Sequence, residues 1–203
     1  MTSRQRVIAT LNHTEPDVLA IDFGAMRSTG ISAVAYNKLK KYLGLTGGVT
    51  KLYDVFQQLA EPEPEILDRL GGDLVQLHRF APAFGITIDK WKPGKLSDGS
   101  DCIVPEGYNP IKSKNGELEI VDDGKVIAVM PKDGLYFDQV YKPCENVQTI
   151  GDIDKLSFPE ISDMELRFFE SEAKRLYETA GYLQYLFGTL HCSIRPTGHC
   201  KSP

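Results

Sequence analysis

The sequence predicts an α/β fold, and two patterns carry this prediction. In the first part of the chain, short apolar runs bounded by turn residues alternate with segments whose apolar residues recur every three or four positions. This is the pattern of strands followed by amphipathic helices. Between about residues 85 and 142 the runs shorten and are separated by Ser97-Asp98-Gly99, Asn115-Gly116 and Asp123-Gly124, which are typical hairpin turns. We therefore expect an α/β domain over residues 1–181 with a β-hairpin insertion at about 85–142.

The first strand and helices are predicted from caps and periodicity. Thr2 and Gln5 have the spacing of a capping box at the start of a helix. The apolar run VLAIDF, residues 18–23, has the length of a buried strand. A helix should follow it, with Ser28 or Thr29 as its cap and Gly44 at its end.

The later elements repeat this order. We expect a helix that begins at Pro62 and is stopped by Gly71, followed by a strand within residues 73–80. Ser162 and Glu165 form a second capping-box pattern, and the helix they open should extend to Ala180. The run YLQYLF, residues 182–187, is then the last expected strand.

Composition excludes several classes of function. The 203 residues carry a net charge of −5 without a run of Lys or Arg, so we expect no nucleic-acid binding. No window approaches the roughly 20 apolar residues of a membrane span, and no secretory leader is recognisable. We therefore expect a cytoplasmic protein without a membrane partner, in which Cys102 and Cys144 are reduced thiols without a structural role.

Several stretches, taken in order, resemble a known family. They are RQRVIATLNHTEPDVLAIDFG, STGISAVAYNKLKKYLGL, KLYDVFQQLAEPEPEILDRLGGDLVQL, WKPGKLSDGS, DDGKVIAVMP and LYFDQVYKP. This order resembles the opening of the uroporphyrinogen decarboxylase superfamily, and in particular its branch of corrinoid-dependent methyltransferases from anaerobic microbes. The resemblance implies a (β/α)8 TIM barrel with the active site at the carboxyl ends of the strands.

The length of the chain limits how much of that barrel we expect. Such a barrel typically takes roughly 250 residues, and only three strand-helix alternations can be counted here. We therefore expect the N-terminal portion of the barrel, in a truncated chain. Self-association or a complementing chain would then be needed to cover its open sheet.

Two motifs of the decarboxylases test the activity that the resemblance implies. Where that family has M-R-Q-A-G-R, this chain has Arg27 and Gly30 but Ile31 in place of the second arginine. After the strand within residues 73–80 the family has the aspartate of F-S-D-I, whereas here His78 and its neighbours offer no carboxylate. Asp54 resembles that aspartate but comes before the helix that begins at Pro62, not after it. The expected function of a full-length form is thus methyl transfer between a small substrate or thiol and a corrinoid protein. The alternatives are a uroporphyrinogen decarboxylase and a catalytically inactive fragment or assembly module.

Three residues are candidates for substrate binding, and no catalytic residue is assigned. Asp22 and Arg27 follow the first predicted strand, where barrel enzymes place functional groups; alternatively they pair with each other or cap the next helix. His78 follows the second such strand and could exchange protons near neutral pH, or could be an ordinary surface histidine.

The tail, residues 182–203, diverges from the family and contains four possible metal ligands, His191, Cys192, His199 and Cys200. They form adjacent doublets, whose side chains point to opposite faces of an extended segment. At most one member of each doublet converges on a metal, and a structural zinc needs four ligands. We expect no metal or cofactor to be bound by this chain; zinc and a corrinoid partner belong to the full-length relatives that the resemblance implies.

Overall fold

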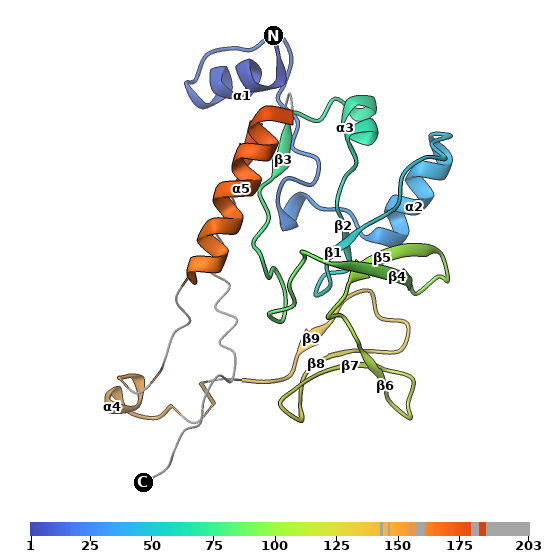
Figure 1. Ribbon diagram of the computed structural model, residues 1–203, viewed down its shortest axis with the longest axis vertical. Coiled ribbons are helices and arrows are strands. Elements are labelled where there is room, and N and C mark those ends of the chain that lie inside the picture. The colour runs from blue at the N-terminus through green and yellow to red at the C-terminus, as the bar shows by residue number, and fades with distance from the viewer. Residues whose placement is uncertain (143, 146, 155, 157–160, 180–182, 186–203) are drawn as a thin grey trace.

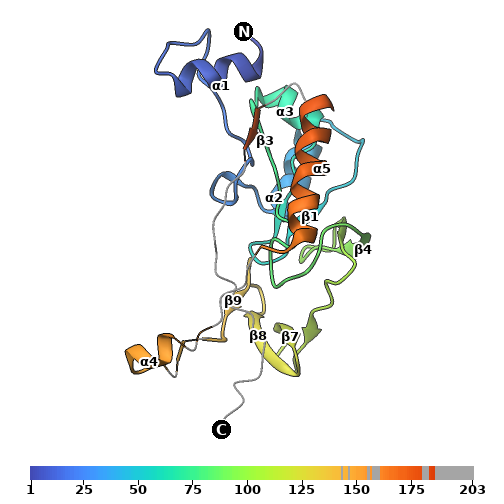
Figure 2. The ribbon, with the colours of Figure 1, turned by 60° about the vertical axis from the view of Figure 1, so that its left-hand side comes forward.

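The computed structural model describes residues 1–142, 144–145, 147–154, 156, 161–179 and 183–185. It is a mixed α/β structure of helices and small sheets, and the described residues do not form a closed barrel. The molecule is elongated, with helix α1 at one end and a four-stranded antiparallel sheet at the other (Figures 1 and 2).

The helices begin and end at local sequence signals. Their bounds are Ser3–Leu11 for α1, Ala33–Tyr42 for α2, Pro64–Leu70 for α3, Ile150–Ile153 for α4 and Asp163–Thr179 for α5. The predicted capping box of α1 is confirmed, because the Gln5 amide donates to the Thr2 hydroxyl and the Thr2 amide donates to the Gln5 side chain. Ser162 caps α5 as predicted, accepting from the Glu165 amide at 3.2 Å.

Two predicted helix starts are wrong by a few residues. Ser32, and not Ser28 or Thr29, caps α2 by accepting from the Ala35 amide, because residues 27–29 form a separate turn of 3-10 helix. Helix α3 begins at Pro64 rather than Pro62, since Glu63 is still extended. The predicted ends at Gly44 and Gly71 are confirmed, and both glycines have left-handed backbone with φ of 70°.

Ten short strands form four small sheets among the described residues. Their bounds are Leu52–Asp54 (β1), Leu59–Ala60 (β2), Leu74–Gln76 (β3), Trp91–Lys95 (β4), Asp101–Pro105 (β5), Ile111–Lys112 (β6), Leu118–Asp122 (β7), Lys125–Met130 (β8), Asp138–Gln139 (β9) and Leu183–Tyr185 (β10). Strands β1 and β2 pair antiparallel, as do β4 and β5, and β6 to β9 form a meander. Strand β3 pairs with β10 in parallel, with Leu74 opposite Leu183.

The predicted hairpins are present within residues 85–142. The β7–β8 hairpin turns at Asp123 and Gly124, whose φ values of 46° and 72° are those of a type I′ turn. The core connects this region with the N-terminal elements: Tyr36, Ile66 and Phe137 are all almost completely buried.

The predicted strand at residues 18–23 is wrong. Val18 and Leu19 are 58% and 80% exposed, and no ladder forms on this segment among the described residues. Instead, the Ile21 amide donates to the Asp73 carboxylate at 3.0 Å and the Asp73 amide donates to the Ile21 carbonyl at 2.8 Å. Asp73, the residue directly before β3, thus takes the place of a neighbouring strand at Ile21.

The parallel pair is the feature on which a barrel interpretation depends. Helix α5 precedes β10 in sequence and contacts it, and it lies beside β3 in Figure 1. Parallel neighbours require such a crossover connection. In the described part of the chain, no helix is both long and apolar enough to cross a membrane.

Candidate functional site

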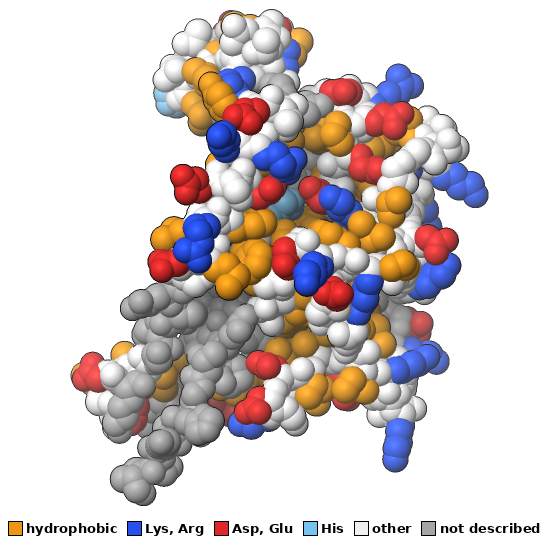
Figure 3. Space-filling view, in the orientation of Figure 1, with side chains coloured by type: hydrophobic (Ala, Val, Ile, Leu, Met, Phe, Trp, Pro, Cys, Tyr) orange, Lys and Arg blue, Asp and Glu red, His pale blue; other side chains and the backbone are white. Residues whose placement is uncertain are grey.

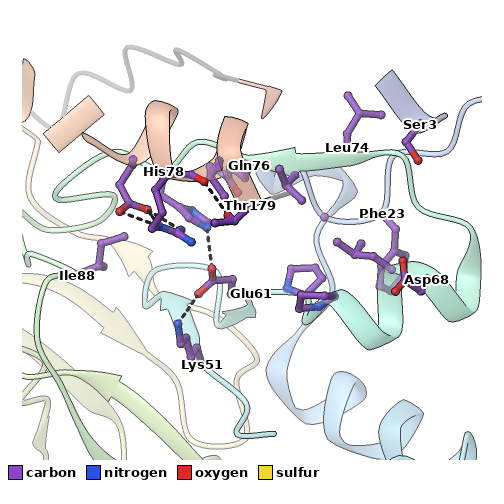
Figure 4. Close-up of a pocket in the computed structure, with 18 of the residues that line it drawn as sticks. Ser3, Phe23, Lys51, Glu61, Asp68, Leu74, Gln76, His78, Ile88 and Thr179 are labelled. Carbon is purple, nitrogen blue, oxygen red and sulfur yellow. Dashed lines mark hydrogen bonds and ion pairs between the residues drawn. The ribbon is translucent and has the colours of Figure 1, made fainter. Parts of the chain in front are cut away.

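A cavity of about 1200 Å³ lies between α5, β3 and the hairpin of β1 and β2. Figure 4 shows that its labelled lining side chains come from several elements, including the start of α1, β3 and the end of α5. Its apolar lining includes Phe23, Leu67, Leu74, Ile88, Trp91 and Phe168, and its polar lining includes His78 and the charged residues Lys51, Glu61, Glu172 and Arg175. Apolar walls with a few convergent polar groups are typical of a small-molecule site.

His78 is the sequence-predicted site residue that lines this cavity. It lies two residues beyond the carboxyl end of β3, and its ring lies 4.4 Å from the ring of the buried Tyr53. Burial lowers the pKa of His78 below its ordinary value, so the imidazole is neutral at pH 7. Its Nδ1 atom is buried and has no hydrogen-bond partner among the described residues.

Glu61 and Lys51 complete a polar cluster around His78. Lys51 comes directly before β1 and Glu61 directly after β2, and the Glu61 amide donates to the Lys51 carbonyl at 2.9 Å. The antiparallel hairpin therefore places the two side chains opposite each other, with Lys51 Nζ 3.4 Å from Glu61 Oε2. Glu61 Oε1 in turn lies 3.8 Å from His78 Nε2, and both contacts are visible in Figure 4.

Helix α5 forms the opposite wall and is anchored to the segment after β3. Arg79 donates two hydrogen bonds to Glu165, at 2.7 and 3.0 Å, and Phe80 packs against Phe168 with ring centroids 5.1 Å apart. On the cavity side of α5, Arg175 pairs with Glu172 at 2.7 Å. The helix thus contributes a cation whose charge is already neutralised.

Arg27 and Asp22 do not line this cavity. Arg27 forms an ion pair with Asp54, which is fully buried, and donates to the Pro82 carbonyl. Asp22 accepts from the Ala25 amide at 2.8 Å and from the Thr29 hydroxyl at 3.0 Å. Both side chains hold the loop before α2, so the structure does not bring the three predicted residues together in one site.

Four charged residues of the cavity wall were not predicted from the sequence as site residues: Lys51, Glu61, Glu172 and Arg175. Lys51 and Glu61 flank the two short strands, and their register could have been inferred only if the segment 51–61 had been recognised as a hairpin. Its turn contains neither Asn-Gly nor Asp-Gly, and Gln58 supplies the left-handed position with φ of 56°. The usual sequence signal of a tight hairpin is therefore missing.

The described residues contain no group of three or more His, Cys, Asp or Glu side chains placed to hold a metal ion. Cys102 is buried and unpaired, and burial raises the pKa of its thiol. Cys144 is exposed and unpaired. The predictions for His191, Cys192, His199 and Cys200 lie outside the described residues.

Charge on the molecular face of Figure 3 is mixed. Acidic and basic side chains are interspersed with apolar ones, and neither sign forms a continuous patch on this face. Comparison with known proteins adds no further constraint, because no family model, no curated protein and no solved structure matches the chain.

Proposed function

We propose that the chain forms part of a uroporphyrinogen decarboxylase-like (β/α)8 barrel whose full-length form transfers methyl groups between a small substrate or thiol and a corrinoid protein. The order of the resembling segments supports this, as does the parallel pairing of β3 with β10 next to the crossover helix α5. The observation that carries the proposal is the position of His78, just beyond the carboxyl end of β3 and in the wall of the cavity. Barrel enzymes place their reacting groups at this end of the strands.

The role proposed for His78 is that of a proton acceptor. A neutral imidazole can take the proton of a thiol as its sulfur forms a bond to the incoming methyl group. The resulting imidazolium would lie next to the Glu61 carboxylate, at the 3.8 Å separation of the two side chains. The electron pair of the broken bond stays with the methyl carrier, so atoms and charges balance.

The metal of the proposed full-length enzyme has no set of three or more His, Cys, Asp or Glu ligands among the described residues. A zinc ion needs three or more protein ligands, and the described residues do not gather such a group. The corrinoid would be carried by the partner protein and would supply or receive the methyl group. The proposal for this chain therefore rests on substrate binding and proton transfer alone.

Arg27 favours methyl transfer over decarboxylation of a porphyrinogen. The decarboxylases use arginines of this motif to bind substrate carboxylates, whereas Arg27 here pairs with the buried Asp54 and the Pro82 carbonyl. A decarboxylase would need a different cation, and those that line the cavity include Lys51 and Arg175. Decarboxylation is therefore kept as an alternative outcome of the same experiment.

Methylcobalamin and 2-mercaptoethanol provide a direct assay for the purified full chain. We expect demethylation of methylcobalamin, followed by its absorption spectrum, to depend on the chain and to fall by about 100-fold in His78→Gln, because general base catalysis contributes at least that much. His13→Gln is the matched control, since His13 lies at the end of α1, away from the cavity lining.

A parallel assay with uroporphyrinogen measures release of carbon dioxide. Decarboxylation without methyl transfer would replace the proposal by its first alternative. If the folded protein shows neither activity, the proposal would be replaced by its second alternative, an inactive fragment or assembly module.

A further inference from the structure

The Glu61 carboxylate is shared between the Lys51 ammonium and the neutral His78 imidazole. Its Oε2 atom lies 3.4 Å from Lys51 Nζ, and its Oε1 atom lies 3.8 Å from His78 Nε2. Charge-assisted hydrogen bonds are shorter, at roughly 2.7 to 2.9 Å. Neither partner therefore holds Glu61 tightly, and a small movement could strengthen one contact at the expense of the other.

Lys51 is the cation of the cavity that is open to a ligand. Arg175 is committed to Glu172 by three hydrogen bonds of 2.7 to 3.1 Å. The side chain of Lys51 is 45% exposed, its ammonium lies 5.5 Å from the centre of the Trp91 ring, and within the described ranges it makes no hydrogen bond. An ammonium has three donors to offer, so an anion in the cavity could bind to Lys51 without breaking a hydrogen bond.

The pKa of His78 depends on the positions of Lys51 and Glu61. Burial is the largest effect and lowers its pKa, Glu61 raises the pKa and Lys51 lowers it. The remaining charged groups that face it are Glu172 from α5 and Asp54 from β1, and the uncharged ring of Tyr53 packs against it. The balance between Lys51 and Glu61 therefore controls how readily His78 takes a proton.

We propose that the cavity binds a small carboxylate with an apolar body, whose anionic end pairs with Lys51 and thereby frees Glu61 to pair with His78. The apolar body would contact Ile88, Trp91 and Phe168 of the cavity wall. The ligand would thus prepare the proton acceptor as it binds. This inference deepens the proposed function by naming a substrate class and a way of activating His78, and it rests on the role given there to His78.

The test is an NMR titration of the histidine ring resonances of the full chain, with His78 assigned by its loss in His78→Gln. Hexanoate is the probe and hexanamide its uncharged control. We expect hexanoate, but not hexanamide, to move the titration of His78 to higher pH. In Lys51→Met we expect about tenfold weaker hexanoate binding, because a hydrogen bond to a charged group is lost. We also expect His78 of Lys51→Met to titrate at higher pH than His78 of the wild type even without ligand, because the charge of Lys51 lowers its pKa.

Glu61→Gln separates the proposed switch from a direct effect of the ligand charge. Hexanoate should still bind this variant, but the shift in the titration of His78 should become smaller, because only the direct effect of the ligand charge and of the neutralised Lys51 remains. Lys95→Met is the matched control, since Lys95 pairs with Asp101 on the exposed surface, and it should behave as the wild type.

Equal hexanoate affinity in Lys51→Met and wild type would overturn the inference, as would an unchanged response in Glu61→Gln. Because the titration needs no turnover, a chain that responds to hexanoate but transfers no methyl group would retain this inference and refute the proposed function. Circular dichroism of each variant establishes that it is folded.

Discussion

Replacing Asp54 by Ala should destabilise the fold severely, because this carboxylate satisfies three groups at once. Asp54 is completely buried, accepts from the amides of Phe56 and Gln57 at 2.9 and 3.1 Å, and pairs with Arg27. Each amide left without a partner costs about 1–3 kcal/mol, and breaking a buried ion pair costs about 3–5 kcal/mol.

These costs overlap rather than add, since neighbouring groups relax together. We therefore expect the free energy of unfolding to fall by about 3–5 kcal/mol in Asp54→Ala. Asp54→Asn keeps an oxygen that can accept from both amides and loses the charge, so its cost should be smaller. Arg27→Met leaves the carboxylate buried without its cation and should cost about 3 kcal/mol.

Urea unfolding at pH 7, followed by circular dichroism and by the fluorescence of Trp91, measures these differences. Asp101→Asn is the control, because Asp101 and Lys95 form an exposed pair with side chains 87% and 64% accessible; its effect should stay below about 0.5 kcal/mol. A loss below about 1 kcal/mol in both Asp54→Ala and Arg27→Met would refute the structural role. Arg27 would then again be available to bind a substrate.

Three further predictions concern the backbone, a buried hydroxyl and pH. Gly71→Ala should destabilise the chain by about 1 kcal/mol in urea unfolding, because Gly71 has φ of 70° while the added methyl group would meet only ordinary contact with Ile21; Gly47→Ala, in open space, should be neutral by the same measurement. Tyr53→Phe should raise the free energy of unfolding by about 1 kcal/mol, because the buried hydroxyl finds no partner within the described structure; an unfolding curve that shows a loss instead would mean that the hydroxyl is hydrogen-bonded. Burial lowers the pKa of His78 from its ordinary value of 6.5, so the unfolded chain takes up a proton that the folded chain resists as the pH falls below 6.5. The contribution to stability is complete above pH 6.5 and is lost below it, and urea unfolding at a series of pH values should show less acid sensitivity in His78→Gln.

Local chemistry explains which elements could be predicted from the sequence. The capping box at Thr2, the cap at Ser162, the left-handed glycine at Gly71 and the Asp123-Gly124 turn all depend on atoms within a few residues of one another. The correct prediction of these features therefore needs no knowledge of the tertiary structure. The start of α2 was missed because Thr29 belongs to a separate 3-10 turn, Arg27–Thr29, and Ser32 caps the helix; this turn is held by longer-range contacts of Arg27 and Asp22.

The site required long-range information that the sequence pattern does not contain. His78 could be proposed because it follows an apolar run, but its two charged neighbours reach it from a hairpin without the usual turn residues. Arg27 was proposed because it follows an expected strand. Its place in the sequence did not reveal that its side chain pairs with Asp54. A charged side chain near a strand end can bind a substrate or hold a loop in place. Here Arg27 pairs with the buried Asp54 and therefore holds the loop.

The segment at residues 18–23 shows why an apolar run alone does not specify a strand. A strand exists only when a neighbour accepts and donates its backbone hydrogen bonds. Strand β3 pairs with β10 along one edge, and among the described residues the segment 18–23 is tied to its start through the bonds between Ile21 and Asp73, the residue directly before β3. The amide and carbonyl of Ile21 are hydrogen-bonded, while Val18 and Leu19 remain largely exposed. The apolar run is recognisable in the sequence, but its hydrogen bonding depends on tertiary contacts such as the one between Ile21 and Asp73, which lies 52 residues further along the chain.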